Sequence, residues 1–82
     1  MGEYSIEKAS FRIGRNMDND IQINSWLVGQ HHAQINVQPG NTYLSNLDRS
    51  VGTYVNHKLI SRHPLRHGDL ISIGGHQLKY LE

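Results

Sequence analysis

Apolar residues stand at every second position along most of this chain, and that alternation restricts it to strands. Segment 33–38 shows it most clearly, since Ala33, Ile35 and Val37 alternate with polar residues. The same spacing marks segments 11–13, 21–23, 71–73 and 78–80, with further apolar residues at 54–55. No window of about eleven residues carries the i, i+3, i+4, i+7 stripe of an amphipathic helix. The pattern predicts an all-β fold.

Turn residues separate these segments. Pro39-Gly40 fits a type II turn that joins 31–37 to 42–47 as a hairpin, since proline presets the second position and glycine supplies positive φ at the third. Gly74-Gly75 fits a tight primed turn between 70–73 and 76–81. Many short strands, spaced about 8–12 residues apart, predict an antiparallel sandwich or barrel.

Length and composition bound the architecture. With 82 residues and no cysteine, we expect a single domain over residues 1–82 that is held together by its apolar core, without disulfides or thiolate metal sites. We also expect residues 1–2 and 81–82 to be additions at the chain ends, and the whole to be excerpted from a longer protein. The sequence shows no signal peptide or apolar span, so we expect a cytoplasmic protein.

Charge argues against nucleic acid as a partner. The net charge is only +1, and the basic residues of the loops are dispersed with few aromatic residues beside them. Without an apolar span, a membrane is not expected as a partner either.

The six histidines do not form a convincing metal motif. His63 and His67 have the i, i+4 spacing of a helical pair, but Pro64 lies between them. His31 and His32 are adjacent, so they point to opposite faces of an extended chain. A calcium loop starting at Asp18 fails at both required positions, which are Ile23 and Gly29. We therefore expect no metal and no cofactor.

Catalysis is not predicted either. The chain has no cysteine, and no serine stands in a nucleophile elbow. We therefore expect a binding module and not an enzyme.

Several loop residues suit a small anion. Gly14-Arg15 ends the first strand, and an arginine there can direct its guanidinium toward a phosphate. Ser50 offers a hydroxyl and Gly29 a backbone N–H. Taken singly, a solvated arginine, a turn-capping serine and a turn glycine are equally good interpretations.

Together these segments resemble the forkhead-associated (FHA) domain, a reader of phosphothreonine peptides. The resemblance covers residues 11–81 through five segments in order: Gly14-Arg15, Asp20 to Ile23, His32-Ala33, the L-D-x-S-x-G-T-x-V-N pattern at 47–56 and L-x-x-G-D-x-I-x-I-G at 65–74. It implies an antiparallel β-sandwich of about eleven short strands with binding loops at one end.

The resemblance also implies roles for individual residues. Phosphate contacts would come from Arg15, from the segment matching S-R-x-H and from Ser50, while His32 would brace the loops through hydrogen bonds. The implied phosphopeptide-binding positions are Arg15, Gly29, Gln30, His31, Ser50 and Val51. The implied loop scaffold is Gly14, His32, Gly52, Thr53 and Asn56.

The chain departs from the family pattern at three contact positions. S-R-x-H is replaced by Gly29-Gln30-His31-His32, and the asparagine of N-G-T by Val51. Hydrogen bonds to a charged group contribute about 1.5–3 kcal/mol each, so these losses predict weakened phosphopeptide binding. Gln30, a protonated His31 and the Gly29 N–H offer partial compensation.

Two functions remain open for a protein partner. One is weak phosphothreonine recognition, and the other is phosphate-independent docking through the same loops. Trp26 suits either the core or an apolar loop end. Oligomerisation through a sandwich face is a third possibility, although a monomer is the expectation.

Overall fold

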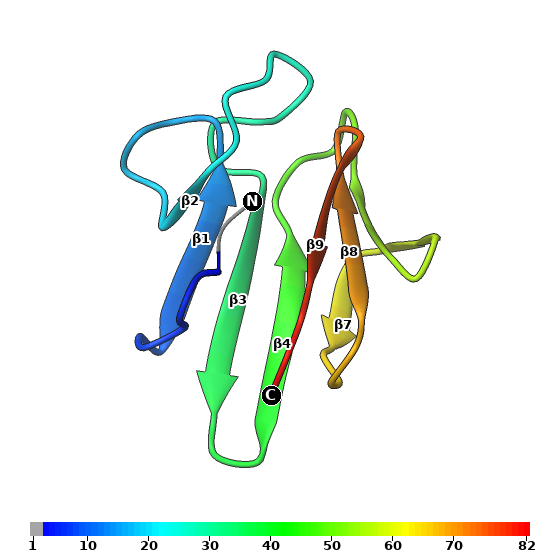
Figure 1. The fold of residues 1–82 in the computed structure, drawn as a ribbon. Coiled ribbons are helices and arrows are strands. Elements are labelled where there is room, and N and C mark those ends of the chain that lie inside the picture. The colour runs from blue at the N-terminus through cyan, green and yellow to red at the C-terminus, as the bar shows by residue number, and fades with distance from the viewer. Residues whose placement is uncertain (1–2) are drawn as a thin grey trace.

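The computed structural model describes residues 3–82, which contain nine strands and no helix (Figure 1). The expectation about residues 1–2 lies outside the described residues. The strands are β1 (Ser10–Gly14), β2 (Ile21–Gln22), β3 (Ala33–Gln38), β4 (Asn41–Asn46), β5 (Thr53–Val55), β6 (Lys58–Ile60), β7 (Arg62–Pro64), β8 (Leu70–Ile73) and β9 (His76–Lys79).

Two sheets form the predicted β-sandwich. One has the order β2-β1-β3-β4-β7 and the other β6-β5-β8-β9. All strand pairs are antiparallel except β1 with β2, which run parallel and place Ile13 opposite Ile21. The all-β prediction is confirmed, with nine strands where about eleven were expected. Outside the strands, the Val37 N–H donates to the Ala9 carbonyl at 2.9 Å, and Tyr80 exchanges backbone bonds with Gly68 and Asp69 at 2.7 and 2.9 Å.

Both predicted hairpins are present. The Pro39-Gly40 turn joins β3 to β4, with Gly40 at φ 70° and Gln38 paired with Asn41. Gly74 and Gly75 join β8 to β9 with φ values of 54° and 82°. Positive φ at two consecutive residues is the signature of a type I′ turn, whose twist matches that of the strands it connects.

The core lies between the two sheets, and the alternating residues fill it. Its members are Phe11, Ile13, Ile21, Ile23, Val28, Ala33, Ile35, Leu44, Val55, Leu65, Ile71 and Ile73. Val37 is an exception to the predicted alternation, because it lies at the end of β3 beside the hairpin turn and is exposed. Trp26 is 84% exposed, so the core interpretation of this residue is wrong.

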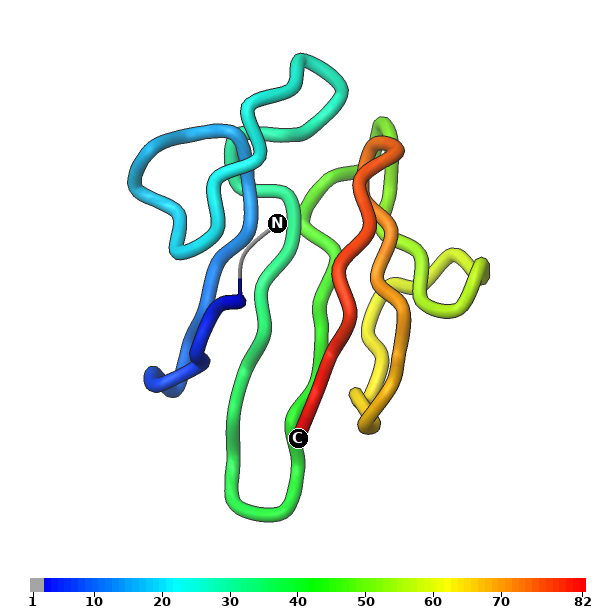
Figure 2. Tube along the Cα trace, viewed as in Figure 1, coloured from blue at the N-terminus to red at the C-terminus, as the bar shows by residue number. Residues whose placement is uncertain are grey.

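The connections at one end of the sandwich form what we call the loop end. It comprises the β1–β2 loop (15–20), the β2–β3 loop (23–32), the β4–β5 loop (47–52) and the β8–β9 turn (74–75) (Figure 2). The β3–β4 turn and the β7–β8 loop lie at the opposite end. Between residues 3 and 82 there is no helix of the length and apolar character needed to span a membrane.

Candidate functional site

The β1–β2 and β2–β3 loops are joined through their backbones. The Arg15 N–H donates to the Gly29 carbonyl at 2.9 Å, and the Asn16 N–H donates to the Gln30 carbonyl at 3.3 Å. Gly14 permits this approach, because a Cβ at that position would collide with the Gln30 carbonyl oxygen. The backbone of Arg15 is therefore fixed against the segment that carries Gly29 and Gln30.

Asn19 strengthens this junction from a buried position. Its Nδ2 donates to the carbonyls of Asn16 and Gln30 at 2.8 and 2.7 Å. Its Oδ1 lies 3.1 Å from Nδ1 of His31. The sequence pattern placed Asn19 only within a rejected calcium loop starting at Asp18 and did not predict this role. An asparagine in a turn, able to bond to nearby backbone, was the available signal.

His31 is oriented toward the β1–β2 loop. Because both Nδ2 hydrogens of Asn19 are donated to carbonyls, Asn19 Oδ1 is the acceptor and His31 Nδ1 is the donor. His31 Nε2 lies 3.7 Å from the Asp18 carboxylate. A positive charge on His31 would thus be balanced by Asp18, which limits what it could offer a ligand.

His32 connects the β2–β3 loop to the β4–β5 loop from the interior, where its side chain is fully buried. The Gly29 N–H donates to Nδ1 at 2.9 Å, and Nε2 lies 2.7 Å from the Gly52 carbonyl. Since a carbonyl can only accept, Nε2 carries the proton and Nδ1 does not. The neutral ring therefore satisfies one donor and one acceptor of two different loops.

The β4–β5 loop is closed by Asp48. Its Oδ2 accepts the Val51 N–H at 2.7 Å and the Gly52 N–H at 3.4 Å. The pKa of Asp48 is lowered chiefly by the Val51 N–H, against the opposing effect of burial. Asp48 belongs to the L-D-x-S-x-G-T-x-V-N pattern at 47–56, but this pattern did not predict its role. An aspartate that begins a short turn was the available signal.

Two buried or partly buried polar residues support the same loop from β4 and β5. Asn46 Nδ2 donates to the Asp48 carbonyl at 2.7 Å, and Asn46 Oδ1 accepts the Thr53 hydroxyl at 2.8 Å. Thr53 is fully buried. Ser50 and Arg49 are then the exposed residues at the tip of the loop, and Val51 is half-buried.

These contacts bring most of the predicted residues to the loop end. The loops joined by the bonds described contain Arg15, Gly29, Gln30, His31, His32, Ser50, Val51 and Gly52. Gly14 ends β1 and Thr53 begins β5, directly beside these loops. Asn56 does not belong with them. It lies beyond the far end of β5, where Nδ2 donates to Asp69 at 3.0 Å and Oδ1 accepts the Leu70 N–H at 3.0 Å.

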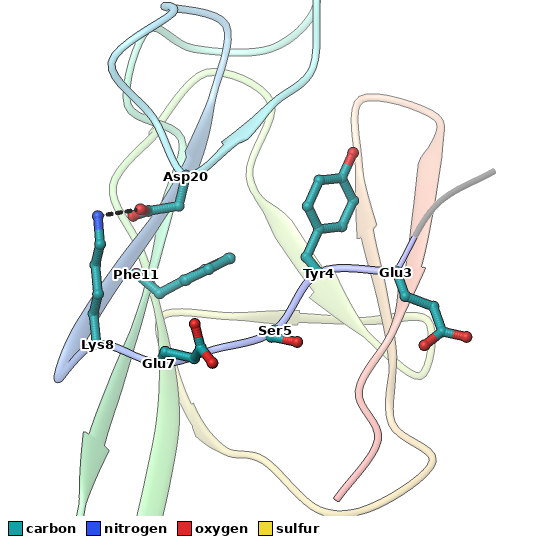
Figure 3. A pocket seen from close by; sticks show the side chains of 7 residues that line it. All are labelled: Glu3, Tyr4, Ser5, Glu7, Lys8, Phe11 and Asp20. Carbon is teal, nitrogen blue, oxygen red and sulfur yellow. Dashed lines mark hydrogen bonds and ion pairs between the residues drawn. The ribbon is translucent and has the colours of Figure 1, made fainter.

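A separate hollow of about 390 Å³ lies where the N-terminal segment approaches β1 (Figure 3). It is a poor anion site, because three carboxylates line it with one lysine. That lysine, Lys8, is already paired with Asp20 at 2.7 Å. The lining residues are Glu3, Tyr4, Ser5, Glu7, Lys8, Phe11 and Asp20. Within residues 3–82, no three histidine, aspartate or glutamate side chains gather closely enough to hold a metal ion.

Known proteins of similar sequence and structure share this architecture. The chain is 42% identical over 79 residues to the transcriptional regulatory protein EmbR of Mycobacterium bovis. The aligned region spans 94% of this chain but only 20% of that protein. A structure of Mycobacterium tuberculosis EmbR with a low-affinity phosphopeptide superposes with a TM-score of 0.91 at 38% identity, covering 95% of this chain and 21% of that one.

A further similar structure is the FhaA FHA domain in complex with the intracellular domain of Rv3910. Its TM-score is 0.84 at 27% identity, with 90% of this chain and 81% of that chain covered. The family model for the FHA domain matches residues 11–74, which include every strand from β2 to β8 and most of β1. The chain therefore belongs to the FHA domain family, as its sequence motifs predicted.

Proposed function

We propose that this domain is a non-enzymatic, monomeric interaction module that binds phosphothreonine-containing segments of protein partners through its loop end. Arg15 and Ser50 hold the phosphate in this proposal, and the substituted positions make binding weak. Related FHA domains support it, since EmbR has been solved with a phosphopeptide and FhaA with a protein partner.

The observation that carries the proposal is the continuous set of bonds between the loops of Arg15 and Ser50. Arg15 N–H bonds to the Gly29 carbonyl, Gly29 N–H to His32 Nδ1 and His32 Nε2 to the Gly52 carbonyl, at 2.9, 2.9 and 2.7 Å. Loops fixed in this way lose little conformational entropy when a ligand binds, so even a few charged contacts support recognition.

The available charges suit a phosphate only in part. A phosphothreonine carries about −1.5 to −2 charges at neutral pH and offers three acceptor oxygens. Arg15 supplies a fixed positive charge, and Arg49 beside Ser50 supplies a second on the exposed loop tip. Gly29 has no hydroxyl, Gln30 has no charge, and His31 is engaged by Asn19 and Asp18. Each missing charge-assisted bond lowers affinity about ten- to a hundredfold.

Phosphate-independent docking is the second candidate function. It is favoured by the same substitutions, since Gly29 and Val51 remove polar contacts from the loop end, and by the exposure of Trp26. In that case, threonine and phosphothreonine peptides would bind equally. Self-association through a sandwich face would instead raise the sedimentation mass with protein concentration.

The test is a titration with matched threonine and phosphothreonine peptide pools, followed by the amide chemical shifts of the domain. We expect phosphate-dependent shifts at Arg15, Ser50 and their neighbours, and we expect Arg15→Ala to abolish them. Arg66→Ala is the matched control, because Arg66 is an exposed arginine at the opposite end of the sandwich. Equal responses to both pools would remove phosphothreonine recognition and leave docking.

A further inference from the structure

The β2–β3 loop contains a well-defined turn whose tip is apolar. Val28 N–H donates to the Ser25 carbonyl at 3.0 Å, and Leu27 N–H lies 3.3 Å from the Ser25 hydroxyl oxygen. Trp26 and Leu27 occupy the two central positions of this turn. They are 84% and 43% exposed. Figure 1 shows the segment around them projecting beyond the neighbouring loops.

The turn is anchored to the sandwich at both sides. Val28 is buried in the core, and the Ser25 N–H donates to the Ile23 carbonyl at 2.9 Å. The Leu27 carbonyl also packs close to Gly74 in the β8–β9 turn. Trp26 therefore extends from a fixed backbone, and its side chain has only two rotatable bonds to immobilise when it makes a contact.

The fold does not account for this choice of residues. Central turn positions favour glycine, asparagine, aspartate and proline, which adopt turn geometry at little cost. Tryptophan there gains little from burial and leaves a large apolar surface in water. Positions where a local rule is broken without a structural gain are expected to be functional.

The surroundings of the turn define what it can accept. Residues 21–30 contain no charged side chain. The turn itself therefore offers no counter-charge to a charged ligand group, whereas an apolar group would gain from burial against it. The turn is also continuous with the candidate phosphate site, because Gly29, two residues after Leu27, bonds to the Arg15 backbone.

We propose that Trp26 and Leu27 form an accessory contact for an apolar side chain of the same partner segment whose phosphothreonine is held by Arg15 and Ser50. This inference rests on the proposed function. It supplies an apolar contribution to affinity in a domain whose polar contacts are depleted, and it makes an aliphatic or aromatic neighbour of the phosphothreonine the preferred ligand.

The test uses Trp26 as its own reporter, because it is the single tryptophan of the chain. Two phosphothreonine peptide pools are compared, one flanked by leucine, isoleucine and phenylalanine and the other by aspartate and lysine. The apolar pool is expected to shift the emission of Trp26 to the blue and to reduce its quenching by acrylamide. Trp26→Ala is expected to weaken binding of the apolar pool about tenfold and to leave binding of the charged pool unchanged.

Leu81→Ala is the matched control, since Leu81 is 59% exposed but lies at the C-terminal end, outside the loops. Amide shifts at Arg15 are recorded in the same titrations, so the two proposals fail separately. Phosphate-dependent shifts at Arg15 with unchanged Trp26 emission and no pool preference would overturn the accessory contact alone. Absence of phosphate-dependent shifts would overturn both, and equal emission changes with unphosphorylated apolar peptides would overturn the coupling to phosphothreonine.

Discussion

The carboxylate of Asp48 lies directly against Gly29, with Oδ1 2.9 Å from the position that a Cβ of residue 29 would occupy. The other carboxylate oxygen is held by the Val51 N–H at 2.7 Å, so the side chain is not free to swing away. The β4–β5 loop can thus pack this closely against residue 29 because glycine has no side chain there.

Gly29→Ala is therefore expected to destabilise the domain. The added methyl group must displace Asp48 and weaken its bonds to Val51 and Gly52, at a cost of about 1–2 kcal/mol. The free energy of unfolding from urea denaturation measures this loss. Ser50→Ala, at an exposed position in the β4–β5 loop close to Asp48, should change the free energy of unfolding by less than about 0.5 kcal/mol. An unchanged midpoint for Gly29→Ala would show that Asp48 moves aside freely.

Asp48 should also contribute to acid sensitivity. Its pKa lies below the ordinary value of an aspartate, mainly because the carboxylate accepts the Val51 N–H. A group with a depressed folded pKa stabilises the fold above its unfolded pKa, and this stabilisation is lost as the pH falls through the folded value. Denaturation between about pH 5 and pH 2 is expected to show this loss.

Asp48→Asn tests that contribution, because it removes the titrating group while keeping one acceptor. At pH 7 the variant is expected to be less stable by about 1–2 kcal/mol, with a shallower decline toward low pH. The decline should not vanish, since Asp20, through its bond to Lys8, and Asp69 also have lowered pKa values. If the free energy of unfolding fell equally steeply with pH in the variant and the parent, Asp48 would not contribute to the acid sensitivity.

The alternation of apolar residues was sufficient to predict most of the strands and most of the core, but it did not predict β6 or β7. Ile35 and Ile71 are buried as that period requires, and the Gly40 and Gly74-Gly75 turns follow from local backbone preferences. These features depend on neighbouring residues alone. The parallel pairing of β1 with β2 depends on the path of the β1–β2 loop, which brings the chain back beside β1 in the same direction. No short-range pattern in the sequence specifies that path.

The candidate site could be predicted only in part, because its supports are contacts between residues far apart in sequence. Family motifs located Arg15, His32 and Ser50 at one end. They did not reveal that Asn19 bonds to the Gln30 carbonyl or that Asp48 fills the space beside Gly29. Polar residues in loops have many local partners available, so long-range bonds of this kind emerge only from the folded arrangement.

His32 is expected to be a neutral Nε2–H tautomer. The Gly29 N–H requires an unprotonated Nδ1, and the Gly52 carbonyl requires a proton on Nε2. Long-range nitrogen–proton NMR correlations distinguish the two tautomers directly. The Nδ1–H form would contradict the bonding described.

Removal of the His32 ring tests the same contacts through their contribution to the stability of the domain. His32→Ala leaves a buried donor and a buried acceptor unsatisfied at about 1–3 kcal/mol each, a large fraction of the stability of a small domain. We expect a lower thermal midpoint and faster amide exchange in both the β2–β3 and β4–β5 loops. Exchange that accelerates in only one loop would show that the ring does not couple them.

Gln30→Arg should strengthen phosphopeptide binding without a cost in stability. The side chain of Gln30 is exposed, and its carbonyl is held by Asn19 Nδ2 at 2.7 Å, so a new guanidinium would extend from a backbone that is already fixed. One added charge-assisted bond to phosphate predicts a gain in affinity of about tenfold or more, decreasing as salt is raised. Calorimetric titration at two salt concentrations measures both effects. Gln38→Arg, at an exposed position beside the β3–β4 turn at the opposite end of the sandwich, adds the same charge away from the loop end and should leave affinity nearly unchanged. If both variants gained equally, the effect would be one of net charge, and position 30 would have no contact with the phosphate.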